Sequence, residues 1–288
     1  MYSLIVPRIN DYKYDFKTLF SIWNDYQNLK NGKSEHFEFD FSRCDFLKQN
    51  AVAFLGGMIS YIKLNGGTVE LKIETLIPAL RVNLEQNGFL YAMGVDAAPW
   101  DGNSIPYRED RSADYEEIAR YLQNKWIGRG WLNIDPELAK AIVSNVLEIY
   151  SNAFTHSYSP NGVYSCGQNY PMLKKIKITV IDFGIGIPQS VRSYLQSLGQ
   201  TDTILDEETL RLAFTKGFST RPELGGLGLK LLKEFIQRNN GRLEVYSHGG
   251  YALIDASGEH YEGIGSFFTG TVVNISLNND QKVYYRID

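Results

Sequence analysis

The chain has 288 residues, 43% hydrophobic and 22% charged, so it can bury a core and form one large or two modest domains. Its 29 basic and 33 acidic residues give a net charge of −4, which disfavours a general nucleic-acid binder. The longest uncharged apolar run, Ala51 to Ile62, is shorter than the roughly 18 residues that a membrane-spanning helix needs. Two distant cysteines, Cys44 and Cys166, and the lack of a secretion-signal pattern predict a reducing, cytoplasmic location.

The first part of the chain alternates between strand and helix patterns. Apolar residues three or four apart, as at Val52, Leu55 and Ile59, indicate helices. Helices are predicted at 16–29, 49–64 and 79–87, and strands at 3–9, 36–41, 68–73 and 89–93. This alternation predicts a small α/β regulatory or docking domain over residues 1–95 with its own core.

Residues 96–112 combine prolines, a glycine and several charges without an apolar period. This composition predicts a linker, and the alternative is a long surface loop inside one domain. A second domain is then expected over residues 113–288.

The second part predicts helices on one face of a mixed sheet, mostly antiparallel at its C-terminal end. The expected helices are 115–127, 136–155, 207–215 and 227–239, and the expected strands are 175–181, 242–247, 251–255 and 271–277. Residues 158–173 are rich in Gly, Ser and Asn, and we expect an elaborated loop there that covers a pocket or binds a partner.

The helix at 136–155 has an unusual polar face. Asn145, Glu148 and Asn152 lie near one another on it, and no Lys or Arg follows Lys140. Solvent-exposed faces are usually rich in Lys, Arg and Glu, although an ordinary amphipathic helix remains the alternative. An amide one turn from a carboxylate suits a hydrated metal ion, because the amide can ligate while the carboxylate polarises a water.

Two glycine-rich segments follow. Asp182 ends a predicted strand and is followed by Gly184 and Gly186, which permit close approach of a ligand to the backbone. Glycines at 225, 226 and 228 open the predicted helix at 227–239, where free N–H groups favour a phosphate. Each segment alone is weak evidence, and neither is a Walker loop or a Rossmann fingerprint.

The combination of these motifs, in this order, resembles the N, G1 and G2 boxes of the GHKL ATPases (gyrase, heat-shock chaperone, histidine kinase and MutL type) over residues 113–278. The resemblance implies a Bergerat-fold α/β sandwich that binds ATP and Mg²⁺. It implies that Asn152 ligates Mg²⁺, that Glu148 activates water, and that Asp182 reads the adenine amine with Thr271 behind it. The remaining implied ATP contacts are His156, Gly184, Gly186, Lys216, Ser219, Thr220, Gly226, Leu227, Gly228 and Leu229, with 216–226 as a lid.

The N-terminal part resembles a STAS domain of the anti-anti-sigma-factor type at residues 37–42, 44–47, 66–71 and 84–89. A generic small α/β docking domain is the alternative. The regulatory serine of that family would fall at Gln49 or Asn50, and neither residue can be phosphorylated.

Three functions remain open from the sequence. The first is a slow ATPase that works as a nucleotide-driven conformational switch on a protein partner, or on a second copy through the N-terminal part. The second is a serine/threonine kinase of the anti-sigma-factor type, and the third is a non-catalytic ATP-dependent binding module. A histidine autokinase is disfavoured, because no histidine lies between residues 37 and 155.

Overall fold

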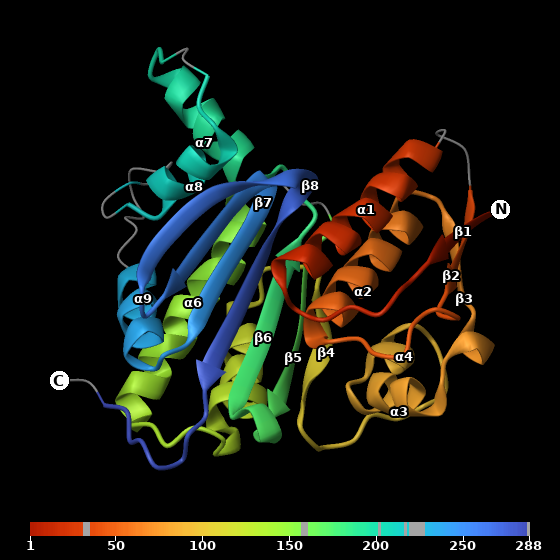
Figure 1. Cartoon of the computed structure of the whole chain (residues 1–288), viewed down its shortest axis with the longest axis horizontal. Helices are drawn as coiled ribbons and strands as arrows, with labels where there is room; N and C mark the ends of the chain where they lie inside the picture. The colour runs from red at the N-terminus through yellow and green to blue at the C-terminus, as the bar shows by residue number, and fades with distance from the viewer. Residues whose placement is uncertain (31–34, 157–160, 201–202, 216–217, 219–227, 287–288) are drawn as a thin grey trace.

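A computed structural model describes residues 1–30, 35–156, 161–200, 203–215, 218 and 228–286. The described chain holds a three-stranded sheet in the order β1-β2-β3 and a five-stranded sheet in the order β4-β5-β6-β8-β7. Helices α1 (Lys13–Leu29) and α2 (Gln49–Leu64) lie between the two sheets (Figure 1). None of the helices in this described part combines the length and apolarity that crossing a membrane requires.

The smaller sheet is parallel throughout. Its strands are β1 (Tyr2–Ile5), β2 (His36–Asp40) and β3 (Thr68–Leu71). Helix α3 (Pro78–Gln86) follows, and the strand expected at 89–93 is wrong, because helix α4 (Phe89–Ala92) stands there. Gly88, at φ +79°, separates the two helices, and the Asn87 side chain accepts a hydrogen bond from the N–H of Phe89 at 3.0 Å.

The larger sheet is antiparallel at every pairing between neighbours. Its strands are β4 (Ser104–Asp110), β5 (Val163–Tyr170), β6 (Lys175–Asp182), β7 (Arg242–Asp255) and β8 (Gly258–Asn278). Strand β4 lies inside the segment predicted as a linker, and β5 occupies half of the predicted loop at 158–173. The glycine-containing β5 pairs with β4 across a register shift and with β6 along its whole length, which local sequence patterns do not reveal.

The helices that follow β4 match most of the predicted ones. They are α5 (Tyr115–Tyr121), α6 (Pro136–His156), α7 (Gly186–Ser197), α8 (Asp206–Ala213) and α9 (Gly228–Arg238). After α5 the chain continues as a π turn at Leu122–Trp126 and a 3-10 turn at Ile127–Arg129. Helix α7 was not predicted, because Gly186 and Pro188 suggest a turn; both stand in its first turn, where proline is tolerated.

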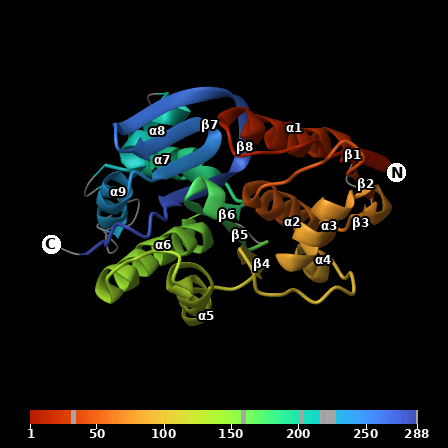
Figure 2. The ribbon, with the colours of Figure 1, turned by 60° about the horizontal axis from the view of Figure 1, so that its bottom comes forward.

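Alternate residues of β6 face two different hydrophobic clusters. Ile176, Ile178 and Val180 join the cluster built from α6 and α9. Ile181, and Phe183 just after the strand, join the cluster built from α1 and α2. Figure 2 shows α6 and α2 on opposite sides of these strands. The α1–α2 cluster also takes in residues of β5, β7 and β8, so it crosses the predicted linker instead of ending at residue 95.

Several buried polar residues lie beside the α1–α2 cluster. Asp11 lies between Lys48 and Lys177, with Lys48 Nζ 2.6 Å from its carboxylate. On the adjoining strands, Thr179 donates to the Asn274 side chain at 2.8 Å, and the Gln49 amide donates to Asn274 at 3.3 Å. The N-terminal helices are therefore attached to the sheet by ionic and amide contacts as well as by apolar ones.

Candidate functional site

Helix α6 carries the polar residues that the sequence singled out. Glu148 is half-buried, and burial raises the pKa of its carboxyl above the ordinary value. Asn152, one turn later, is exposed. Asn145 is buried and has a structural role: its amide donates to Ala141 O at 2.7 Å and accepts from the N–H of Leu232 at 3.2 Å, which joins α6 to α9.

Asp182 and Thr271 are register partners at adjacent positions of β6 and β8. Both are buried, at 4% and 8% exposure. Asp182 continues the alternation of Ile178 and Val180, so its side chain belongs to the α6 face of the sheet. Its Oδ1 accepts a hydrogen bond from the N–H of Gly184 at 2.9 Å, which turns the chain sharply after the strand.

Two residues of β7 hold the turn at Gly184–Ile187, and no sequence motif predicts them. Ser247 Oγ, fully buried, accepts from the N–H of Ile187 at 3.0 Å and donates to Gly270 O at 2.9 Å. His248 Nε2 lies 2.7 Å from Ile185 O, and burial lowers the pKa of its imidazole, so the neutral ring donates there. Their role depends on the packing of β7 beside a turn that is distant in the sequence, and no local motif predicts this packing.

Gly186 is required at this turn. Its φ is +73°, and a Cβ would lie 2.7 Å from both Ser247 Oγ and Thr269 O. Gly270 is equally confined, because a Cβ there would lie 2.0 Å from Asp182 O. The backbone at Asp182 and at Gly186 is thus packed against β7 and β8 with no room for a further side-chain atom.

The other predicted ATP contacts can be located only by their place in the chain. Gly184 is buried in the turn itself. Gly228 and Leu229 begin α9, and His156 ends α6. The remaining predicted residues lie outside the described part of the chain: Lys216, Ser219, Thr220, Gly226 and Leu227.

The arrangement places acceptors and helix ends on one face of the sheet. Asp182 ends β6, Thr271 lies opposite it within β8, and α6 with Glu148 and Asn152 packs on β6. The N-terminus of α9, an 11-residue helix, provides N–H groups with no partner inside the helix. These groups can accept from an amine, ligate a cation and bind an anion.

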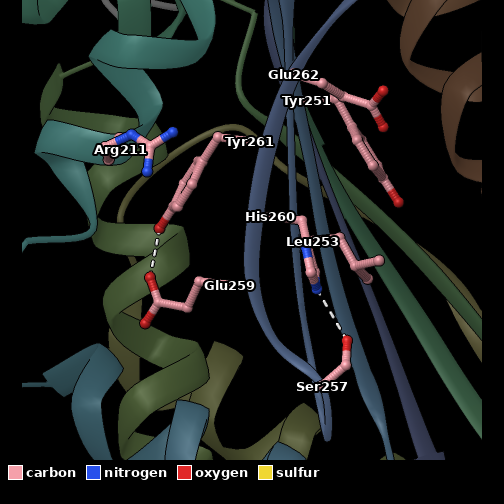
Figure 3. Close-up of a pocket in the computed structure, with 8 residues that line it drawn as sticks. All are labelled: Arg211, Tyr251, Leu253, Ser257, Glu259, His260, Tyr261 and Glu262. Carbon is pink, nitrogen blue, oxygen red and sulfur yellow. Dashed lines mark hydrogen bonds between the residues drawn. The ribbon is translucent and has the colours of Figure 1, made fainter.

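An open groove of 560 Å³ lies elsewhere, on the β7–β8 hairpin and α8 (Figure 3). Arg211 lies over the ring of Tyr261 at 4.8 Å, and the Tyr261 hydroxyl points to Glu259. On the other side, His260 Nε2 lies 2.8 Å from Ser257 Oγ. Among the predicted site residues that the structure describes, none lines this groove.

Comparison with known proteins identifies a family and two relatives that this chain resembles. Residues 136–279 match the model of the histidine kinase-, DNA gyrase B- and HSP90-like ATPase family. The chain is 24% identical over 210 residues to sensor histidine kinase TmoS of Ectopseudomonas mendocina, covering 67% of this chain and 18% of that protein. It is 34% identical over 83 residues to chemotaxis protein CheA of Klebsiella aerogenes, covering 26% of this chain and 13% of CheA. The chain thus matches less than a fifth of the length of either relative.

Proposed function

Because the chain belongs to the family of histidine kinase-, DNA gyrase B- and HSP90-like ATPases, we propose that it binds ATP with Mg²⁺ on the α6 face of the larger sheet. The observation that carries the proposal is the pair Asp182 and Thr271. Two buried polar side chains are paired across β6 and β8 there, beside a turn that admits only glycine at position 186. A carboxylate can accept several hydrogen bonds, so an adenine amine could donate to Asp182 alongside the N–H of Gly184.

The residues of α6 fit the rest of the ligand. The Asn152 amide is exposed and would hold Mg²⁺, which prefers oxygen ligands and supplies charge neutralisation to the phosphates. The Glu148 carboxylate has a raised pKa, which makes it a stronger base once ionised, so it would take a proton from the attacking water. Asn152 and Glu148 are four residues apart on one helix, so both face the same ligand.

We propose further that binding and slow hydrolysis of ATP switch the conformation of the chain toward a protein partner. The chain has an N-terminal α/β layer packed directly on the back of the nucleotide-binding sheet, which supports a conformational role. A STAS-like origin of that layer remains part of this proposal. The alternative, transfer of the phosphoryl group to a serine or threonine of a partner, is favoured by the same Glu148, because either a water or a hydroxyl can lose its proton to it.

One experiment on the full chain separates these functions. Binding of a fluorescent ATP analogue is measured with and without Mg²⁺, followed by phosphate release from γ-labelled ATP. Magnesium-dependent binding with phosphate release in the absence of any protein substrate supports the switch ATPase. ATP binding without phosphate release supports the kinase if the γ-label is transferred to a protein that binds this chain. No binding of adenine nucleotide would contradict the proposal as a whole.

A further inference from the structure

Phe183 lies between Asp182 and Gly184, yet its side chain turns away from the α6 face. It is 4% exposed and belongs to the cluster of the N-terminal helices. Its ring centroid lies 5.0 Å from Trp23 of α1 and 5.5 Å from Phe54 of α2. It lies 5.3 Å from Phe268 of β8 in an edge-on arrangement. Aromatic pairs at these separations contribute beyond their buried area.

Helix α2 leaves no spare room beside that ring. A Cβ on Gly57 would lie 2.4 Å from Phe183 Cε2 and 2.7 Å from Tyr164 Cδ2. Real Cβ atoms do not approach that closely, so α2 packs its backbone directly on Phe183. Close-packed interiors shift as units, because small displacements meet neighbouring atoms at once.

The backbone of Phe183 is also the backbone that places Asp182 and Gly184. The Asp182 carbonyl faces Gly270 with no room for a Cβ, and the Asp182 side chain holds Gly184. A displacement of α2 against the Phe183 ring therefore reaches the carboxylate and the turn within one peptide unit on either side.

We propose that Phe183 is a positioning residue through which the N-terminal helices set the geometry of the nucleotide site. This inference rests on the proposed ATP binding. It adds that the packing of α1 and α2 on the sheet is coupled to nucleotide binding at the site. Coupling is reciprocal, so nucleotide also stabilises the packing of α2 on the sheet. A partner that moved α2 would thereby alter nucleotide affinity without touching the nucleotide.

Two neighbouring glycines of α2 provide a matched test in the full chain. Gly57→Ala places a methyl group against Phe183, whereas Gly56→Ala places one 2.3 Å from the Tyr107 hydroxyl on β4. We expect Gly57→Ala to weaken binding of a fluorescent ATP analogue about tenfold more than Gly56→Ala, within the usual range of coupling between sites. Melting temperatures measured alongside show how far both variants lose stability.

Rescue distinguishes positioning from general damage. The double variant Gly57→Ala with Phe183→Leu removes the closer of the two clashing rings and leaves Tyr164 in place, and we expect it to bind nucleotide more tightly than Gly57→Ala alone. In the wild type, the ATP analogue should slow hydrogen exchange of amides in α2, and the slowing should shrink in Gly57→Ala. If Gly57→Ala gives no folded protein, Phe183→Leu is compared with Phe89→Leu, a buried ring that packs on Tyr107 instead.

The outcomes are separable. If the wild type binds nucleotide and the two glycine variants bind it equally well, the inference is wrong while the proposed function stands. The inference is also contradicted if Phe183→Leu does not restore nucleotide binding to Gly57→Ala, or if the ATP analogue does not change hydrogen exchange of the α2 amides. A wild-type chain that binds no nucleotide would overturn both.

Discussion

The two faces of the larger sheet are built from alternate residues of the same strands, but their polar side chains are used differently. On the face of the N-terminal helices, charges and amides are matched inside the protein, as with Asp11 between Lys48 and Lys177. On the α6 face, Glu148 is only half-buried and Asn152 is exposed. The first pattern holds two parts of the chain together, whereas the second leaves polar atoms where a ligand can reach them.

This difference assigns stability to one face and chemistry to the other. Changes on the N-terminal face should first lower the free energy of unfolding. Changes on the α6 face should first alter nucleotide binding or turnover. Phe183 is the exception, because it stands in the turn of the candidate site and packs on the opposite face.

The largest expected effect follows from removing residues 1–95. Deletion would expose rings such as Tyr246 and Phe268, which now pack on Phe16 and Phe20. Each large apolar side chain contributes about 1.5–3 kcal/mol when buried, and a domain has only about 5–15 kcal/mol in total. We therefore expect residues 96–288 alone to aggregate, measured as soluble yield and circular dichroism. A monomeric, folded fragment with wild-type ATP affinity would break the comparison.

The next effect concerns turnover. Replacing Glu148 by alanine should lower the rate of ATP hydrolysis about 10²–10⁴-fold, the usual loss of a general base, with little change in affinity. Steady-state phosphate release and equilibrium binding measure the two quantities separately. Glu137→Ala, an exposed carboxylate in the first turn of the same helix, is the control and should leave both unchanged. Normal turnover in Glu148→Ala would favour a non-catalytic binding module.

Local sequence patterns predicted the elements that carry their own signal. The helix at Gln49–Leu64 is apolar on nearly all sides, and its predicted bounds are those of the structure. Strand β5 carries no clear strand pattern because Ser, Gly, Gln and Asn interrupt its apolar residues, and it is defined by pairing with β4 and β6. The roles of Ser247, His248 and Phe183 depend on elements distant in sequence, so no motif could reveal them.

A third prediction tests the ionic contact on the N-terminal face. Burial alone raises the pKa of Asp11, but Lys177 and Lys48 outweigh it and hold the pKa below its usual value. The ion group therefore stabilises the fold at neutral pH, and this contribution is lost as pH falls through the lowered pKa. Asp11→Asn should lower the free energy of unfolding by about 3–5 kcal/mol at pH 7.

The difference between Asp11→Asn and the wild type should begin to shrink below about pH 4, where the Asp11 carboxylate of the unfolded chain becomes protonated, and should be lost as pH falls through the lowered pKa of the folded carboxylate. Urea unfolding at several pH values measures it. Asp45→Asn is the control, because its pair with Arg8 is exposed on both sides and such pairs contribute about 0–1 kcal/mol. Equal destabilisation by the two variants would mean that the buried contact holds the layers no better than a surface pair.

The smallest expected effect is a change of base preference. Asp182 can accept from the adenine amine, whereas guanine presents a carbonyl at the same position and would face it acceptor to acceptor. Asp182→Asn keeps an oxygen for the N–H of Gly184 and adds an amide donor suited to that carbonyl. An unmatched buried polar group costs about 1–3 kcal/mol, so the ratio of ATP to GTP affinity should fall roughly tenfold or more. Competition binding with both nucleotides measures this ratio, and Thr271→Val, which removes only the hydroxyl of the register partner, should lower it less. If Asp182→Asn left the ratio of ATP to GTP affinity unchanged, the role of Asp182 would be structural, like that of the polar side chains on the opposite face. Other residues would then have to recognise the base.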